Sequence, residues 1–89
     1  MTNLKNLLFI ILITVGGFSL AAETIDINSA DKQTLMEVKG VGERRAEAII
    51  NYRETYGPFL SIDELMEVEG IGQATLDANR DILIVNRRQ

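Results

Sequence analysis

Beyond position 22, apolar residues recur at three- and four-residue spacing, and this spacing predicts helices joined by short turns. The longest predicted helix covers residues 43–56, with Ala46, Ile49 and Ile50 on one apolar stripe. Gly57-Pro58 is a strong stop signal at its end. Every regular element that the pattern predicts is helical. With turns of two to five residues, the pattern favours a compact all-α bundle of four to five short helices.

Two shorter helices are predicted from their capping residues. Ser29 is a good N-cap for a helix over residues 30–37, because its hydroxyl can satisfy a free backbone N–H. Ser61, with Glu64 three positions later, predicts a capping box at the start of a helix over residues 62–67.

The C-terminal part predicts a last helix over residues 73–79, followed by an apolar run at 82–85 that is expected to fold back onto the core. The lead-in over residues 24–27 need not be regular. The expected core consists of apolar residues from all of these segments, namely Leu35, Val38, Val41, Ile49, Ile50, Phe59, Leu65, Val68, Ile71, Leu76 and Ile82.

An eight-residue segment is repeated thirty positions later in the chain. Residues 35–42 (LMEVKGVG) and 65–72 (LMEVEGIG) are identical at six positions, and Val41 is replaced conservatively by Ile71. Such a repeat predicts one supersecondary unit that is used twice. In each copy two helices are joined by a Gly-apolar-Gly turn, and the central apolar residue is expected to point inward.

The repeated turn predicts a phosphate-binding site. Each second helix begins directly after its turn, so its first N–H groups have no partner within the helix. These donors and the positive end of the helix dipole attract anions such as phosphate. Two copies related by a rough two-fold axis could hold phosphates on both strands of one duplex, without reading its sequence. The alternative is that Gly-x-Gly is only the way in which this fold turns a corner.

The N-terminal segment, residues 1–22, has the pattern of a cleaved secretory signal peptide. A polar start with Lys5 precedes the uncharged run LLFIILITV, and small residues follow at cleavage spacing near Ala21 and Ala22. A retained membrane anchor is the alternative. The apolar stretch 7–22 has 16 residues, fewer than the ~20 that a helix needs to cross a bilayer core.

Composition limits the chemistry of the chain. Removal of Lys5 leaves eight basic residues against thirteen acidic ones, a net charge of −5. The chain has neither cysteine nor histidine. It therefore lacks the usual ligands of zinc, the commonest general base and the thiol nucleophile. We expect no catalytic residues, no metal site, no cofactor and no small-molecule substrate, since the acidic residues of the second half suit a solvated helix face.

The doubled pattern resembles a tandem helix-hairpin-helix domain, and residues 25–85 resemble the competence DNA-receptor family ComEA. The resemblance rests on dense local matches: INSA at 27–30, VKGVG at 38–42, RRAEAII at 44–50, YR at 52–53, YGPF at 56–59, VEGIG at 68–72 and TL at 75–76. It implies that residues 23–89 form a domain that binds double-stranded DNA without sequence preference in the periplasm. It also implies a role in DNA uptake during natural transformation, together with an inner-membrane DNA-uptake channel.

The charges around the two hairpins predict an asymmetric grip on DNA. Family members that bind well commonly carry basic residues after the first hairpin, and two arginines match those positions here; the second hairpin carries Glu69 and no positive charge. Arg87 and Arg88 suit a solvated tail. The residues expected to contact DNA are Lys39, Gly40, Val41, Gly42, Arg44, Arg45, Gly70, Ile71, Gly72 and Arg80.

Two other functions fit parts of the sequence. An exported protein-docking module that has kept the fold and lost DNA binding would explain the acidic total and the acidic second hairpin. A fragment of a nuclease or ligase fits less well, because no catalytic domain accompanies the repeat.

Overall fold

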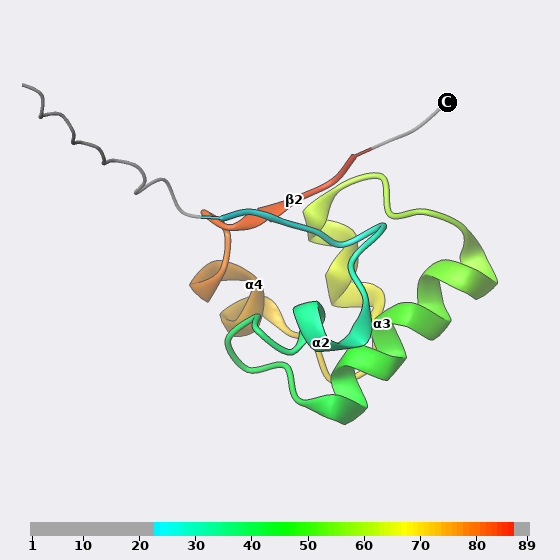
Figure 1. The fold of residues 1–89 in the computed structure, drawn as a ribbon, viewed down its shortest axis with the longest axis horizontal. Helices are drawn as coiled ribbons and strands as arrows, with labels where there is room; N and C mark the ends of the chain where they lie inside the picture. Colours follow the sequence, from blue (N-terminus) through cyan, green and yellow to red (C-terminus); the bar gives the residue numbers. More distant parts are fainter. Residues whose placement is uncertain (1–22, 87–89) are drawn as a thin grey trace, which may run out of the picture.

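The computed structural model describes residues 23–86, in which two short strands lie over a set of helices (Figure 1). The signal peptide expected at residues 1–22 and the tail residues Arg87 and Arg88 lie outside this range. In chain order the elements are β1 (Ile25–Asp26), α2 (Lys32–Leu35), α3 (Glu43–Tyr56), the 3₁₀ helix η3 (Ile62–Glu67), α4 (Gln73–Ala78) and β2 (Leu83–Ile84). The expected helical fold class is confirmed, with four helices in the described range.

The longest helix, α3, has the bounds that the sequence predicts, but α2 begins later than expected. Its N-cap is Asp31, whose carboxylate accepts a hydrogen bond from the Thr34 amide at 2.9 Å. The expected N-cap, Ser29, instead donates its hydroxyl to the Asp26 carboxylate at 2.9 Å. The prediction was wrong because two capping residues compete within three positions, and the side chain of Asp26 occupies the first of them.

The third helix forms over the predicted residues, but as a 3₁₀ helix. Ser61 precedes it without a side-chain capping bond. Glu64 reaches back to the amide of Leu60, at 3.0 Å, and not to that of Ser61. Of the two hydrogen bonds in the predicted capping box, only the one that Glu64 accepts is therefore present, and its donor is the residue before the N-cap.

The prediction that every regular element is helical was wrong at both ends of the domain. The strands β1 and β2 pair in parallel, with Ile25 opposite Leu83. The Ile25 amide donates to the Ile82 carbonyl at 2.7 Å, and the Ile27 amide to the Ile84 carbonyl at 3.1 Å. The lead-in segment is thus tied to the end of the domain, and Figure 1 shows the two strands side by side.

The core contains nine of the eleven predicted residues. The other two, Ile50 and Ile82, are only partly buried. Four more apolar residues are buried: Ile25 and Leu83 in the strands, Ile27 directly after β1, and Ala46 in α3. None of the helices within residues 23–86 is both long and apolar enough to cross a membrane.

The carboxylate of Asp26 joins the two ends of the domain. It accepts hydrogen bonds from the amides of Asn28 and Asn86, at 3.0 and 3.2 Å, and from the Ser29 hydroxyl. Burial of Asp26 opposes its ionisation. The three hydrogen bonds and the nearby charge of Arg53 outweigh this effect, so the pKa of Asp26 lies below its ordinary value.

This lowered pKa predicts a loss of stability in acid. Because the folded-state pKa lies below that of the unfolded chain, Asp26 stabilises the fold above the ordinary aspartate pKa of about 3.9. The contribution is lost as the pH falls through the folded-state value. Urea unfolding of the wild type and Asp26→Asn, at pH 7 and pH 3, should show a smaller acid loss in the variant. Equal losses in the two proteins would contradict the assignment, since the other carboxyls are common to both.

Candidate functional site

The central residues of the two hairpin turns have the same burial and form the same turn hydrogen bond. Val41 and Ile71 are each 5% exposed, as expected for residues that point inward. Their amides donate to the carbonyls of Val38 and Val68, both at 3.0 Å. Each hairpin is therefore closed by one turn hydrogen bond and anchored by one apolar side chain. Because these two amides are used within the turns, Val41 and Ile71 shape the site but leave no free N–H for a ligand.

The two glycines of each hairpin have different conformations. Gly40 and Gly70 have φ values of 87° and 93°, a region that side chains other than glycine rarely adopt. Gly42 and Gly72 have φ values of −95° and −119°, which any residue can adopt. A Cβ at either of these second positions would meet no atom within 4 Å. The fold thus requires glycine at the first position of each hairpin and not at the second.

The second glycines are the N-caps of α3 and α4, and neither provides a side-chain cap. Their carbonyls accept the first helical hydrogen bonds, from Ala46 at 2.9 Å and Leu76 at 3.1 Å. Within residues 23–86, the amides of the preceding helical positions, 43–45 and 73–75, have no backbone or side-chain acceptor. Each hairpin therefore presents a row of free donors at a helix N-terminus.

The first of two connections between the repeats joins α3 to the second hairpin. The Arg45 Nε donates to the carbonyl of Gly70 at 2.8 Å. The position equivalent to Arg45 in the second repeat is Thr75, whose hydroxyl oxygen lies 3.4 Å from the point where a Cβ of Gly40 would lie. Each second helix therefore places a side chain against the first glycine of the other hairpin.

The second connection joins α4 to the first hairpin through Asn79, which is 1% exposed. Its Oδ1 accepts from the Lys39 amide at 2.9 Å, and its Nδ2 donates to the Lys39 carbonyl at 3.0 Å. The Nδ2 also donates to the Thr75 carbonyl at 2.7 Å. Sequence reasoning missed Asn79. The available signal was its alignment with the apolar Ile49 in the repeat, since an amide at a core position needs a polar partner.

The basic residues near the first hairpin differ in whether their charged groups are bound by other residues. Arg44 is exposed and, like Lys39, forms no ion pair within the described residues. A shallow pocket of about 520 Å³ lies between the start of α3 and the second hairpin, lined by Gly42, Arg44, Arg45 and Gly70 among others. This pocket brings together side chains and backbone from both predicted hairpins.

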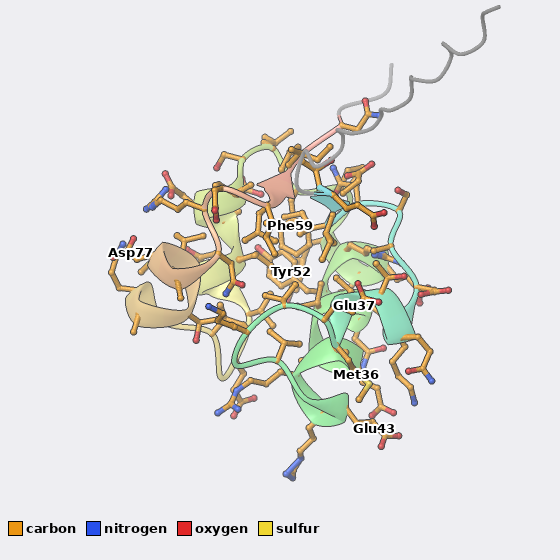
Figure 2. The ribbon with its side chains drawn as sticks, turned by 60° about the vertical axis from the view of Figure 1, so that its left-hand side comes forward. Met36, Glu37, Glu43, Tyr52, Phe59 and Asp77 are labelled. Atoms are coloured by element: carbon orange, nitrogen blue, oxygen red, sulfur yellow. The ribbon has the colours of Figure 1, made fainter. Side chains whose placement is uncertain are left out.

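Acidic residues also lie at this site. Glu43, at the outer end of α3 in Figure 2, is bound by the Lys32 Nζ at 2.9 Å. Lys32 also binds Glu47 at 3.2 Å, and these two carboxylates raise the pKa of Lys32 above its ordinary value. Glu69 lines the pocket and has no cationic partner within residues 23–86. The site is thus only locally basic, on the side of the first hairpin.

Arg80, which the sequence suggested as an assisting residue, lies after the end of α4 in an acidic setting. Its guanidinium binds Asp77 at 2.9 Å and Asp63 at 3.3 Å. The Arg80 guanidinium, followed by the Gln73 amide, holds the pKa of Asp77 below its usual value. Arg80 is therefore bound to two carboxylates, and the three groups together keep a net negative charge, while the other predicted residues gather around the hairpins. Within residues 23–86 no group of three potential metal-ligating side chains is present.

Comparison with known proteins identifies the family. The sequence profile of the helix-hairpin-helix motif matches residues 20–84, which is most of the chain. The chain belongs to the helix-hairpin-helix family. The matched range contains both hairpins, in agreement with the expected tandem helix-hairpin-helix fold.

Relatives share this region at 34–40% identity. An uncharacterised protein of Haemophilus influenzae is 40% identical over 67 residues, covering 74% of this chain and 60% of that protein. ComE operon protein 1 of Bacillus subtilis is 38% identical over 61 residues, covering 68% of this chain and 30% of that protein. The human endonuclease/exonuclease/phosphatase family domain-containing protein 1 is 36% identical over 63 residues, covering 71% of this chain and only 11% of that protein. The chain thus spans less than two thirds of each of these relatives.

The contacts of Asn79 give a testable prediction about the hairpin pair. Asn79→Ala removes three hydrogen bonds and leaves both polar groups of the Lys39 backbone without their partner. We expect a loss of about 2–3 kcal/mol in the free energy of unfolding, measured by urea denaturation. Asn51→Ala is the matched control, since Asn51 is exposed on α3 and forms no side-chain hydrogen bond within residues 23–86. Similar stabilities of the two variants would contradict the role of Asn79.

Proposed function

We propose that this chain binds double-stranded DNA through backbone phosphates, without reading the base sequence. The amides at the start of α3 and α4 capture the phosphates, and the exposed cations beside the first hairpin strengthen the grip. We further propose that the protein acts in the periplasm, in DNA uptake during natural transformation, where it delivers DNA toward an inner-membrane channel.

The conformation of Gly42 and Gly72 carries this proposal. If Gly-x-Gly were only a device for turning the chain, glycine would be needed at Gly40 and Gly70 alone, where φ is positive. At the second positions, serine or aspartate would cap the helix better, as Asp31 does for α2. Glycine there leaves the amides of the following turn open to a large anion, because no side chain covers them.

The two hairpins contribute unequally. The first precedes a helix of fourteen residues, and beside it Lys39 and Arg44 form no ion pair with any residue of 23–86. The second precedes a helix of six residues, and Glu69 stands where the first repeat has Lys39. We expect the first hairpin to supply most of the electrostatic attraction. The second hairpin supplies mainly backbone donors and the geometry that matches a second strand.

The role in uptake rests on relatives and on the N-terminal segment. The relationship to ComE operon protein 1 supports a competence function for this region. Residues 1–22 have the composition of a secretory signal and support export. The larger endonuclease/exonuclease/phosphatase relatives match over only 63–71 residues, which supports a DNA-binding module rather than an enzyme.

A docking module without DNA affinity is the competing function, and Glu69 favours it, since it stands beside the second hairpin with no cationic partner in the described range. A titration of the purified protein against two unrelated fluorescent duplexes separates the two functions. Phosphate contacts of the three cations Lys39, Arg44 and Arg45 predict equal affinities for the two duplexes and a slope of log K against log[salt] of about −2 to −3. Absence of binding at low salt would favour docking.

Substitution of the second glycine of the first hairpin should separate binding from folding. Gly42→Asp adds a good N-cap in an allowed conformation, so the free energy of unfolding should rise by a few tenths of a kcal/mol. The same carboxylate occupies the phosphate position and repels it, so duplex affinity should fall about tenfold or more, measured by fluorescence anisotropy. Gly42→Ser is the control, because it caps the helix without adding charge. Unchanged affinity of Gly42→Asp would show that the hairpin does not bind phosphate.

The two arginines should differ in their effect. Arg44 has no hydrogen-bond partner within residues 23–86, so Arg44→Ala should leave stability unchanged and lower the salt slope by about one unit. Arg45→Ala also breaks the bond to the Gly70 carbonyl and should lower the unfolding free energy. The double variant should weaken binding evenly across sequences. An unchanged slope in the double variant would contradict the assignment of both residues.

A further inference from the structure

A second pocket lies farther along α3, beside the pocket at the first hairpin. Its volume is about 590 Å³, and its walls include Tyr52, Tyr56, Glu67 and Glu69; these four residues define the tyrosine pocket. It adjoins the pocket at the first hairpin, since Ala48 and Glu69 line both. One face of α3 therefore carries an arginine-rich pocket near its start and an aromatic, acidic pocket near its end.

The aromatic wall is held in place by the core. Tyr52 stacks on the fully buried Phe59, with ring centroids 5.1 Å apart and an interplanar angle of 10°. Figure 2 shows these two residues next to each other in the middle of the molecule. Tyr56 lies against Tyr52 with centroids 4.7 Å apart, yet it is 73% exposed. The three rings form a column whose inner end is fixed and whose outer ring faces solvent.

The electrostatic environment of this pocket favours a cation. Within residues 23–86, neither Glu67 nor Glu69 has a cationic partner. Partial burial of Tyr52, followed by the negative charges of Glu67 and Glu64, raises its pKa above the ordinary value. The carboxyl end of α3 adds the negative end of a helix dipole beside Tyr56.

We propose that the tyrosine pocket binds a guanidinium side chain from a basic segment of a partner protein. A planar cation can stack on the exposed tyrosine ring while its N–H groups donate to the carboxylates. A metal ion does not fit, because no group of three potential metal ligands exists within residues 23–86. The pocket is also unsuited to phosphate, so its occupant differs from that of the hairpins. The inference is independent of DNA binding by the chain.

The direct test uses N-acetyl-arginine amide as the probe, with N-acetyl-citrulline amide as an uncharged control of nearly the same shape. Both are titrated into the purified protein and followed by NMR. We expect saturable shifts of the ring signals of Tyr52 and Tyr56 with a millimolar dissociation constant for the arginine probe only. Equal shifts with citrulline, or no shifts at the rings, would overturn the proposal.

Variants distinguish the pocket from the overall charge. Tyr56→Ala should weaken arginine binding roughly two- to fivefold, the range of an exposed cation–π contact, whereas Tyr56→Phe should retain it. Glu67→Gln should weaken binding, and Glu54→Gln should not, although both remove one negative charge. Equal effects of the two glutamate variants would overturn the proposal, because binding would then depend on net charge alone.

Two further measurements exclude other occupants. The tyrosine signals should not change with protein concentration in the absence of probe; concentration-dependent shifts would identify a second copy of the chain as the occupant and overturn the proposal. Tyr56→Ala should bind duplex DNA as the wild type does. Loss of duplex binding in this variant would assign the pocket to DNA and overturn the proposal.

Discussion

The two hairpins of this protein are held in place by each other's helices. The side chain of Arg45 reaches from α3 to the Gly70 carbonyl, and Asn79 reaches from α4 to both polar groups of the Lys39 backbone. Each hairpin is also anchored from within by Val41 or Ile71. Because these connections cross between the repeats, the separation of the two helix N-termini is set by the fold as a whole. This rigidity is what a phosphate-binding pair requires, since two donors must match two strands at once.

The same arrangement makes the proposed DNA contact compatible with the acidic net charge. Near the first hairpin, Glu43 and Glu47 are bound by Lys32, whereas Glu69, which lines the pocket, has no cationic partner within residues 23–86. Backbone N–H groups at a helix N-terminus bind an anion through hydrogen bonds and the helix dipole, so this local attraction needs no basic side chain. We therefore interpret the acidic balance as a limit on long-range attraction, with the site itself still suited to an anion. The unequal contributions of the two hairpins follow from the same distribution of charged residues.

Features that depend on local periodicity were predictable from the sequence. The bounds of α3, the inward orientation of Val41 and Ile71 and the paired hairpins all follow from spacing and from the repeat. The parallel strand pair was not predictable, because the paired residues are separated by 58 positions and each strand has only two residues. Such short pairing leaves no alternation to detect.

The asparagines that organise the fold were missed for a related reason. Asn28 exchanges two hydrogen bonds with the Phe59 backbone, and Asn79 does the same with Lys39. Both contacts join residues at least 31 positions apart, and an asparagine bound in this way has no local signature. For the candidate site, the hairpin backbone was predictable from the sequence. The bond from Arg45 to the Gly70 carbonyl and the ion pairs of Arg80 with two aspartates were not predictable, because side-chain partners depend on tertiary packing.

The most direct test of the account is a residue-resolved NMR titration of the purified protein with a short duplex. If the two hairpins act as one phosphate clamp, the amides of residues 42–45 and 72–75 should shift together, with one dissociation constant and the same salt dependence. The result should be the same for a second duplex of unrelated sequence. Shifts confined to one hairpin, or centred on the C-terminal half of α3, would contradict the central claim.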